Sequence, residues 1–382
     1  MRTKVIVFNG SKKDFDKLLD ERIDKQKRTI NFLEVIQEYN LRITAGKSRS
    51  SESTANDIAL LTKIQVDNCI VRTDDYGSVL SHVTSNFSNI ISQNYDIGTL
   101  YLQNPPKRVY QSVSTFYNDS IECINSKYKT INRSILKSIN KNLNKKVLGQ
   151  ENCKRQIVSN IYRLTTGKTK KPVVIMLYGP SGVGKTESAK VISESLGGKL
   201  LRIQFSMMQT NEAYTYVFGG EHSKSSFARD MIARESNVIL IDEFDKVNSS
   251  FYNAFYELFD EGKYVDLNYE VNLNRAIFIC TCNYMSESEI KKALGPAMFS
   301  RIGCCIKYED IDAECKKQII SDAYNGIVKD LKKDEKDIIL NSNILSWFLE
   351  NAARYDNIRI LKTKLENAIF EKLSDNFIFT DD

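Results

Sequence analysis

The chain has 382 residues, of which 42% are hydrophobic and 27% are charged, and its formal net charge is +6. This composition is typical of a globular protein of two or three domains, and it excludes a disordered chain or a collagen-like repeat. The longest apolar runs reach about a third of the ~20 residues that a membrane-spanning helix needs. The first residues, MRTKVIVFNGSKKDFDK, lack the apolar core of a secretory signal, so a cytoplasmic protein without a membrane segment is expected.

Residues 1–140 predict a small α+β unit that carries no enzymatic motif. The segment Lys4–Phe8 predicts a strand, the charged segment 14–39 a helix, and Cys69–Arg72 a further strand. The isoleucine spacing in 114–144 is typical of an amphipathic helix that connects this unit to the rest of the chain. The unit contains 20 Lys and Arg against 15 Asp and Glu, a mild basic excess that gives only weak support to nucleic-acid binding.

Cysteine and histidine residues give no metal-binding pattern. The two histidines, His82 and His222, have no ligand cluster around them in the sequence, and none of the eight cysteines belongs to a CxxC pair. Several cysteines stand inside apolar runs, where reduced thiols act as small core residues. This usage favours a reducing compartment and argues against a zinc site.

The strongest motif follows a predicted buried strand at Val173–Tyr178. It reads GPSGVGKT, from Gly179 to Thr186, and it runs into a helical pattern, which is the strand–loop–helix context of a P-loop. Glycines let backbone N–H groups approach phosphate oxygens, and the positive end of the following helix faces the same charge. Lys185 is therefore expected to contact the β- and γ-phosphates of ATP, and the Thr186 hydroxyl to bind Mg²⁺.

Two further apolar strands end in polar residues. The segment NVILIDEFDKV places Asp242 and Glu243 at the end of a strand, where Asp242 is expected to hold Mg²⁺ and Glu243 to polarise the water that attacks the γ-phosphate. The strand in AIFICTCNY ends in Asn283, whose amide is expected to hold that water or the γ-phosphate. Parallel sheets bind ligands at this edge, so the three side chains are expected to converge.

The ordered motifs resemble the AAA+ superfamily and, within it, the second ATPase module of the Clp family of protein-remodelling ATPases, over about residues 145–375. VLGQENCKRQIVSNIYR resembles the opening segment of that module, which implies that Val147 and Leu148 contact adenine. LLRIQFS, LFDEGKYVD and GPAMFSRIG are also similar to family segments. By resemblance, Arg301 is the arginine finger that reaches ATP on the adjacent subunit, and Arg359 is the second sensor arginine on the lid helix.

A guanidinium has a physical reason to act at such places. Cleavage of the γ-phosphate spreads negative charge over its oxygens, and an arginine supplied in trans can raise turnover about 10³- to 10⁵-fold. The predicted catalytic residues are Glu243, Asn283, Arg301 and Arg359. The predicted nucleotide-binding residues are Val147, Leu148, Gly179, Pro180, Ser181, Gly182, Val183, Gly184, Lys185, Thr186, Glu187 and Asp242, of which Thr186 and Asp242 are also the predicted metal ligands.

The resemblance implies the architecture and the partners. An α/β P-loop domain with a parallel central sheet is expected at 141–310 and a helical lid at 311–382, after the α+β unit at 1–140. The family implies ATP and Mg²⁺ as cofactors, a protein client, and a homo-oligomer, commonly a ring of six, with its sites at subunit boundaries.

One interval departs from the Clp pattern. Clp unfoldases carry an aromatic pore loop that resembles GYVG between the P-loop helix and the acidic strand. Here the corresponding segment, residues 210–236, is several residues shorter, and Tyr214, Tyr216 and Phe218 are its only aromatic residues before Phe227. Torsins, which are relatives in the same clade, also lack that loop. The sequence therefore does not support processive threading of a polypeptide.

Three functions are compatible with these motifs. The first is ATP-driven remodelling of a protein client. The second is nucleotide-gated assembly or signalling in a mobile-element or defence system, and the third is an AAA+ machine that acts on DNA. Client-stimulated turnover would support the first, oligomerisation without unfolding the second, and DNA-stimulated turnover that falls with salt the third.

Overall fold

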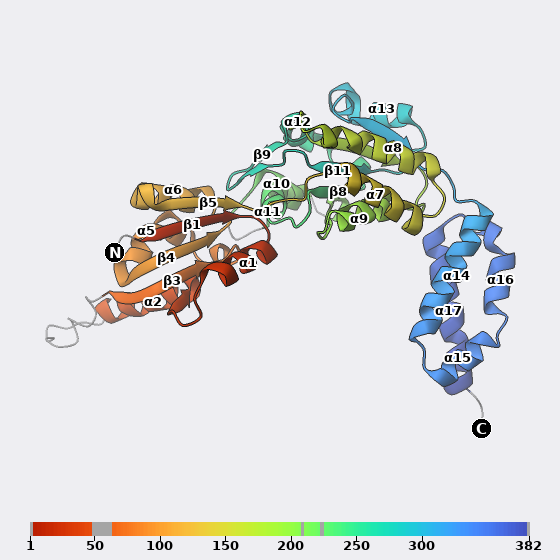
Figure 1. Ribbon diagram of the computed structural model, residues 1–382, viewed down its shortest axis with the longest axis horizontal. Helices are drawn as coiled ribbons and strands as arrows, with labels where there is room; N and C mark the ends of the chain where they lie inside the picture. The colour runs from red at the N-terminus through yellow and green to blue at the C-terminus, as the bar shows by residue number, and fades with distance from the viewer. Residues whose placement is uncertain (1–2, 48–62, 208–209, 222–224, 380–382) are drawn as a thin grey trace.

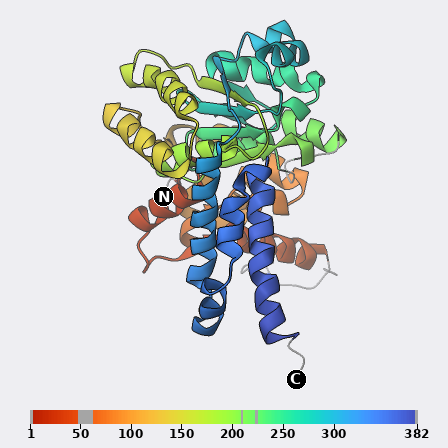
Figure 2. The same ribbon diagram turned by 90° about the vertical axis from the view of Figure 1, so that its right-hand side faces the viewer.

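The computed structural model describes residues 3–47, 63–207, 210–221 and 225–379. Figure 1 shows three units along the chain: an N-terminal sheet with helices, a central sheet with helices, and a C-terminal group of helices. In Figure 2, as in Figure 1, the C-terminal helices extend away from the central sheet. The three units are called the N-terminal, central and C-terminal units below.

The N-terminal unit is a parallel five-stranded sheet in the order β2-β3-β4-β1-β5. Alternate residues of β1, which lies between β4 and β5, pack on opposite faces: Val5 and Val7 join the cluster around Phe87, and Ile6 and Phe8 join the cluster around Phe15. The strands are β1 (Lys4–Asn9), β2 (Thr29–Asn31), β3 (Ile64–Val71), β4 (Tyr95–Gln103) and β5 (Ile121–Asn125). The helices are α1 (Lys12–Arg22), α2 (Phe32–Lys47), η1 (Asp75–Ser78), α4 (Ser81–Ser85), α5 (Phe87–Asn94), α6 (Lys107–Tyr117) and η2 (Asn118–Ser120).

The expected α+β character of this unit is wrong, because every strand pair in its sheet is parallel and helices connect the strands. The charged segment 14–39 is not one helix: the edge strand β2 separates α1 from α2, and β2 shows one buried side chain, Ile30, between two exposed ones. The segment 114–144 likewise contains β5 before its helix begins at Arg133. Short or half-exposed edge strands have few apolar residues in a regular pattern, so the sequence did not predict β2 or β5. The Ser- and Thr-rich sequence of residues 46–54 predicts a loop; α2 extends to Lys47, and residues 48–54 lie outside the described residues.

The central unit is also a parallel five-stranded sheet, in the order β12-β6-β11-β8-β7. Its middle strands are buried along their whole length, as expected for a sheet that is covered on both faces. The strands are β6 (Val173–Tyr178), β7 (Leu201–Gln204), β8 (Val238–Asp242), β11 (Ile277–Thr281) and β12 (Cys304–Lys307). A hairpin of β9 (Lys263–Val265) and β10 (Glu270–Asn272) stands apart from this sheet.

Helices cover the two faces of the central sheet. One core cluster joins the buried side chains of α7, α8 and α9 to the sheet, and a second joins those of α10 to α13 to its other face. The helices are α7 (Arg133–Lys146), α8 (Glu151–Tyr162), η3 (Arg163–Thr166), α9 (Lys185–Ser195), η4 (Phe205–Met207), α10 (Thr210–Phe218), α11 (Phe227–Ile232), η5 (Phe244–Lys246), η6 (Ser249–Phe251), α12 (Tyr252–Glu261) and α13 (Glu287–Phe299). The expected parallel α/β domain is confirmed.

The C-terminal unit is helical, as expected. Asp312 caps its first helix by accepting a hydrogen bond from the Cys315 backbone N–H, and Asn357 caps its last helix in the same manner. Leu361, Leu365 and Ile369 form a buried stripe along that last helix. The helices are α14 (Ala313–Asp330), α15 (Lys333–Leu340), α16 (Ile344–Glu350), η7 (Ala352–Arg354) and α17 (Ile358–Phe377).

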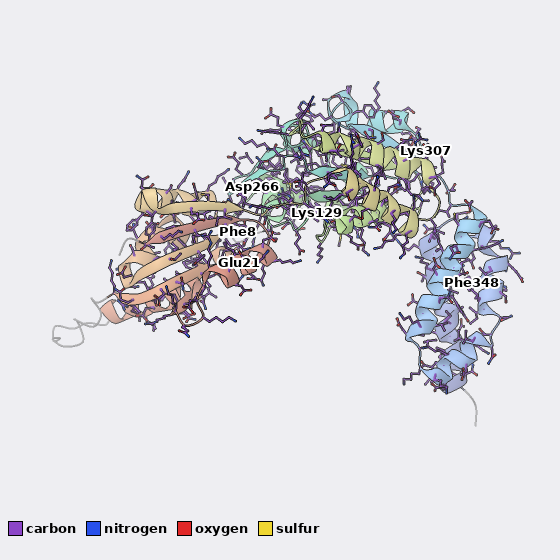
Figure 3. All side chains as sticks on the ribbon, viewed as in Figure 1. Phe8, Glu21, Lys129, Asp266, Lys307 and Phe348 are labelled. Carbon is purple, nitrogen blue, oxygen red and sulfur yellow. The ribbon has the colours of Figure 1, made fainter. Side chains whose placement is uncertain are left out.

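The N-terminal unit contacts the hairpin of the central unit. The Lys107 Nζ donates to the Asp266 carbonyl oxygen over 2.6 Å, and the Lys107 backbone N–H donates to the Asn268 carbonyl oxygen over 2.8 Å. Arg229 forms an ion pair with Asp74 at 2.6 Å. Figure 3 labels Asp266 at this junction.

Within the described ranges, no helix combines the length and the apolar character needed to cross a membrane. All eight cysteines are unpaired, and Cys280 and Cys282 are buried in the central core.

Candidate nucleotide site

The loop between β6 and α9 has the shape of a phosphate-binding loop. Gly179, Gly182 and Gly184 all adopt positive φ, at 120°, 84° and 102°. A Cβ on Gly179 would lie 2.2 Å from the Tyr308 carbonyl oxygen, so only glycine fits there. Val183 is buried, whereas Ser181 and Glu187 are exposed. The predicted residues 179–187 thus form one contiguous loop and helix start.

The side chain of Lys185 is held at the mouth of this loop. Its Nζ donates to the carbonyl oxygens of Gly179 (2.6 Å) and Pro180 (2.8 Å) and to Asn283 Oδ1 (3.1 Å). The contact with Asn283 brings the residues that follow β11 to the loop. Burial lowers the pKa of Lys185, since the charged amine is removed from water. A triphosphate would offer this ammonium group stronger, charged acceptors.

Asp242 lies at the end of β8 and is fixed from two sides. The Thr281 hydroxyl donates to Asp242 Oδ1, and Arg202 pairs with Asp242 Oδ2 at 2.6 Å. Thr281 also accepts a hydrogen bond from the Glu243 backbone N–H over 3.0 Å, so one side chain positions both acids. Asp242 is 6% exposed, which leaves its carboxylate at the sheet edge with limited access to water.

Glu243 adopts a left-handed backbone conformation, with φ 56° and ψ 48°, which is unusual for a residue other than glycine. Its carboxylate is turned toward β7, where Gln204 Nε2 donates to Oε2 over 3.1 Å and the Ser206 hydroxyl donates to the same oxygen. These hydrogen bonds lower the pKa of Glu243 and keep it ionised. The structure therefore shows Glu243 as a carboxylate tethered to the neighbouring strand.

The donors around the sheet edge fit Mg²⁺ bound with a nucleotide. Thr186 and Asp242 are oxygen donors, and Mg²⁺ in such sites uses one or two protein oxygens together with phosphates and water. Asp245, three residues after Asp242, has a buried Oδ1 without a hydrogen-bond partner, which a hydrated cation nearby would satisfy. Within the described part of the chain, no group of three or more acidic, histidine or cysteine residues forms a self-sufficient metal site.

The other predicted contacts approach the loop from two directions. Val147 Cγ1 lies 3.3 Å from the Cβ position of Gly184, and Leu148 follows it in the connection between α7 and α8. The Asn357 Oδ1 lies 2.8 Å from the Cβ position of Gly182, which places the start of α17 against the loop. Arg359 lies in the first turn of α17 and is exposed. The adenine and sensor roles of these residues remain predictions.

Arg301 is not at the nucleotide loop of its own chain. It precedes β12, and the backbone N–H of Gly303 donates to Val174 near the start of β6, whereas the loop follows the end of β6. Its guanidinium donates to Asp260 Oδ2 over 2.8 Å and to the Ala297 carbonyl oxygen over 2.6 Å, and it lies 4.1 Å from the Tyr256 ring centroid. Arg301 therefore lies near the amino-terminal ends of the strands, whereas the glycine loop lies at their carboxyl ends.

Sequence reasoning missed the residues that position the two acids. The segment LLRIQFS, which resembles a Clp segment, contains Arg202, Gln204 and Ser206. Thr281 belongs to the strand of AIFICTCNY, in which the sequence pointed only to Asn283. A polar residue in a strand buried on both faces is a usable signal, because a buried hydroxyl needs a partner. Thr281 is such a residue.

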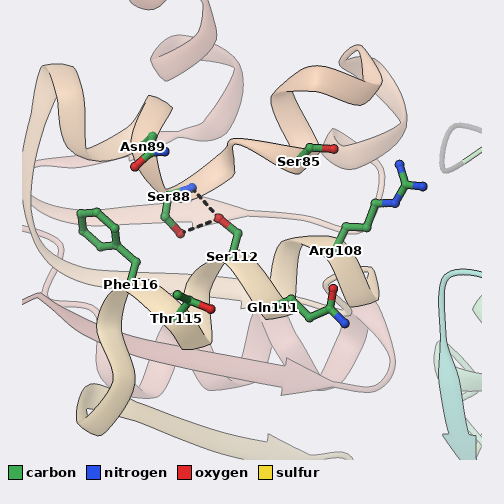
Figure 4. Close-up of a pocket in the computed structure, with 8 residues that line it drawn as sticks. All are labelled: Ser85, Ser88, Asn89, Arg108, Gln111, Ser112, Thr115 and Phe116. Atoms are coloured by element: carbon green, nitrogen blue, oxygen red, sulfur yellow. Dashed lines mark hydrogen bonds between the residues drawn. The ribbon is translucent and has the colours of Figure 1, made fainter.

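A separate cavity of about 490 Å³ lies on the N-terminal unit, beside α5 and α6. Figure 4 shows its polar side chains, and the Ser112 hydroxyl both donates to Ser88 Oγ (3.0 Å) and accepts from the Ser88 backbone N–H (3.2 Å). The two serine side chains thus satisfy one another.

Residues 170–331 match the family described as AAA domain (Cdc48 subfamily). The chain is 26% identical over 270 residues to the chaperone protein ClpB of Malacoplasma penetrans, covering 63% of this chain and 38% of that protein. It is 26% identical over 267 residues to ClpB of Prochlorococcus marinus, covering 59% and 31%. It is also 25% identical over 271 residues to the ATP-dependent Clp protease ATP-binding subunit ClpL of Staphylococcus aureus, covering 64% and 38%. The chain thus spans about a third of the length of these relatives.

Proposed function

Residues 170–331 are an AAA+ ATPase domain of the Clp type, and from this premise we propose that the chain hydrolyses ATP with Mg²⁺ and uses the cycle to remodel a protein client. We propose further that it acts in the cytoplasm as a homo-oligomer, a ring of six by resemblance. Its unpaired cysteines agree with that location. The single observation that carries the proposal is the meeting of Lys185, Asp242, Glu243 and Asn283 at one edge of the central sheet.

The roles at this edge follow from the charges. Lys185 exchanges the Gly179 and Pro180 carbonyl oxygens for phosphate oxygens when ATP binds, and Asn283 keeps its amide next to the same group. Thr186 and Asp242 hold Mg²⁺, which neutralises charge on the β- and γ-phosphates when bound. The backbone N–H groups of the glycine loop complete the anion cradle.

Glu243 accepts the proton of the attacking water in this proposal. Its hydrogen bonds to Gln204 and Ser206 hold it toward β7, so it acts on water only after exchanging them. This arrangement supports a resting state in which ATP binding precedes activation of the base. Arg202, which is paired with Asp242, lies on the same strand as Gln204 and links Mg²⁺ binding to that strand.

Two arginines complete the reaction in the assembly. Arg359 senses the nucleotide from the lid, since α17 begins against the glycine loop. Arg301 lies at the far edge of its own sheet and serves a second copy. An arginine that reaches the γ-phosphate stabilises the charge that develops as the bond breaks.

The short interval before β8 supports remodelling without a threading loop. The Tyr216 hydroxyl donates to Asp230 over 2.6 Å, and the carbonyl oxygen of Phe218 accepts from the Leu267 backbone N–H over 3.1 Å, so the end of α10 is tied to α11 and to the hairpin. Tyr214 is exposed but packs against Phe218 with ring centroids 4.8 Å apart.

Replacing Glu243 tests this proposal. Glu243→Gln is expected to retain ATP while turnover falls about 10²- to 10⁴-fold, because the amide cannot accept the proton. Glu257→Gln, an exposed residue of α12, is the matched control and keeps normal turnover. The trapped variant, held in ATP, is then used to recover a protein client. Normal turnover in Glu243→Gln would remove Glu243 from the mechanism, and a client that binds equally without nucleotide would contradict ATP-driven remodelling.

A further inference from the structure

The connection between α7 and α8, residues 147–150, touches both the central and the C-terminal unit. Val147 Cγ1 lies 3.3 Å from the Cβ position of Gly184 in the glycine loop. The Cβ position of Gly149 lies 3.5 Å from Cys315 Sγ, which belongs to the first turn of α14. We call residues 147–150 the junction segment, because it meets the nucleotide loop on one side and the first helix of the C-terminal unit on the other.

The last residue of the junction segment, Gln150, binds both backbone groups of Glu309. Gln150 Nε2 donates to the Glu309 carbonyl oxygen over 2.6 Å, and the Glu309 backbone N–H donates to Gln150 Oε1 over 3.2 Å. A carboxamide can do this because it carries a donor and an acceptor side by side. One turn further along α8, Cys153 Sγ donates to the Lys307 carbonyl oxygen over 2.8 Å. The start of α8 is thus fastened twice to the chain that leaves the central sheet.

The backbone of the junction segment adopts an uncommon conformation to make these contacts. Gly149 and Gln150 have φ values of 64° and 62°, and the left-handed region is rarely occupied by a residue with a Cβ. Gln150 stands at the N-cap of α8, yet its side chain forms no capping hydrogen bond. Its amide serves Glu309 instead. A backbone outlier that the surrounding contacts hold in place is a reason to look for a function there.

Glu309 is the first residue of the hinge between the central and the C-terminal unit. Tyr308, just before it, is fully buried, and its hydroxyl donates to Ser188 Oγ over 2.7 Å, so Tyr308 belongs to the core of the central unit. The first helix of the C-terminal unit, α14, begins directly after residues 309–312. These four residues are therefore the hinge, and Gln150 holds the end of the hinge that leaves the central unit.

We propose that Gln150 makes the hinge at 309–312 respond to the base of the bound nucleotide, so that adenine as well as phosphate positions the C-terminal unit. The inference rests on the proposed function and on the predicted contact of Val147 and Leu148 with adenine. A base that packs against those two residues fixes the junction segment, and the paired hydrogen bonds of Gln150 pass that constraint to the Glu309 backbone. Gln150 is a positioning residue, because it holds the hinge and not the reacting atoms.

The phosphate end of the nucleotide has a separate route to the C-terminal unit. Asn357 Oδ1, at the start of α17, lies 2.8 Å from the Cβ position of Gly182 in the glycine loop. The junction segment reaches the hinge and α14 instead, at the other end of the C-terminal unit's sequence. The two routes can be distinguished with ligands, because inorganic tripolyphosphate offers phosphate groups without a base, whereas ATP offers both.

The first test measures hydrogen exchange at the hinge, in the full chain carrying Glu243→Gln so that ATP persists. ATP and tripolyphosphate are compared with Mg²⁺, each at a concentration that fills the site by titration calorimetry. We expect ATP to slow exchange in residues 309–312 about threefold or more beyond tripolyphosphate. Gln150→Met keeps the side-chain length without the amide and is expected to remove this difference. Gln156→Met is the control, since the Gln156 side chain of the same helix forms no hydrogen bond among the described residues.

Each outcome of this comparison supports or overturns the inference. A difference between the two ligands that disappears in Gln150→Met and persists in Gln156→Met supports it. Equal protection by ATP and tripolyphosphate in the parent overturns it, and so does a difference that survives in Gln150→Met. A parent that binds neither ligand overturns the proposed function itself, so the two failures are distinguishable.

The second test separates positioning from binding by steady-state turnover with Glu243 intact. In Gln150→Met, turnover at saturating ATP is expected to fall about five- to tenfold, while the half-saturating ATP concentration changes by less than about twofold. Gln150→Glu keeps the acceptor for the Glu309 N–H and loses the donor to its carbonyl oxygen, so an intermediate turnover is expected. Unchanged turnover in Gln150→Met overturns the inference. A higher half-saturating concentration with unchanged saturated turnover also overturns it, because Gln150 would then only assist binding.

Discussion

The two sheets of this chain have the same strand order, but among the described residues the glycine-rich loop of the candidate nucleotide site follows a strand of the central sheet and not of the N-terminal sheet. In each unit the order from edge to edge is fifth, first, fourth, third and second strand of the sheet, all parallel. Between the first strand and the next helix, the central unit has the six residues Gly179–Gly184, whereas the N-terminal unit has only Gly10 and Ser11. Strand order thus creates a ligand-binding edge, and the loop that follows the first strand determines whether phosphate fits there.

The N-terminal edge is closed by a polar network. Asn104, which is fully buried, donates to the Gly10 carbonyl oxygen (2.9 Å) and Thr73 Oγ1 (3.1 Å) and accepts from the Gly10 backbone N–H (2.8 Å). A Cβ on Gly10 would lie 1.9 Å from Ser126 Oγ, so the space is already full. At the corresponding edge of the central sheet, Lys185 is held by neutral acceptors that phosphate can replace. The N-terminal edge is therefore filled by its own polar groups, whereas the central edge presents an ammonium group to a ligand.

The largest effect is expected for a substitution in the glycine loop region of the central sheet. Lys185→Ala removes charge-assisted contacts worth about 1.5–3 kcal/mol, and ATP affinity is expected to fall on the order of 10- to 100-fold. Lys12→Ala, at the corresponding helix start of the N-terminal unit, is the matched control and leaves affinity unchanged. Isothermal titration with ATP and Mg²⁺ measures both. Equal losses in the two variants would contradict the contrast between the sheets.

A pair of asparagine variants sharpens the contrast. Asn104→Ala leaves buried backbone groups unpaired and is expected to lower the free energy of unfolding by about 2–3 kcal/mol without changing turnover. Asn283→Ala is expected to do the reverse: turnover falls about tenfold or more, while unfolding changes little because its partner Lys185 keeps two carbonyl acceptors. Urea denaturation and steady-state turnover are measured for both variants. Similar effects of the two would show that the edges are equivalent after all.

The contact between the units is expected to give a smaller effect. Lys107→Ala removes the hydrogen bond to the Asp266 carbonyl oxygen and is expected to weaken docking of the hairpin by about 1 kcal/mol. Hydrogen exchange in β9 and β10 should become faster. Lys127→Ala, an exposed lysine of the same unit, serves as the control. Unchanged exchange in Lys107→Ala would show that the hairpin does not depend on this contact.

The smallest expected effect is a pH dependence confined to the N-terminal sheet. Hydrogen bonds from Arg22 and Lys4 lower the pKa of Glu122 to about 2. Because the folded-state pKa is depressed, this stabilisation is present above about pH 4.5 and is lost as pH falls toward 2. Glu122 is partly exposed, so the contribution is about 0.5 kcal/mol or less. Urea denaturation of Glu122→Gln and the parent chain should differ slightly at pH 6 and converge near pH 2, and a constant difference would contradict the ion-pair origin.

The central site could be predicted from sequence because its signals are local. The glycine loop, the acids after β8 and Asn283 each stand directly beside a strongly apolar strand, so the parallel sheet brings them together. The resemblance added the position of α17, which spacing alone could not give. Arg202, Gln204 and Thr281 were missed because their roles depend on which strands are neighbours, and strand order is set by packing of the whole unit.

The N-terminal unit shows the limit of the same reasoning. Its strands β2 and β5 are short edge strands, and β2 buries a single residue, so neither repeats an apolar pattern long enough to detect. Asn104 stands in a Pro-rich turn whose positive φ of 47° and buried contacts join three separate strand ends. The sequence next to Asn104 does not indicate its distant partners, Gly10 and Thr73.

Because α17 begins against Gly182, a small movement of the glycine loop would be amplified along this helix. The helix continues for 20 residues beyond that contact, which is about 30 Å at the usual rise per residue. If the loop shifts when phosphate enters or leaves, a ten-degree tilt at this fulcrum displaces the remote tip of the rod by about 5 Å. Such a displacement at the far end of α17 would be about the pitch of one helical turn.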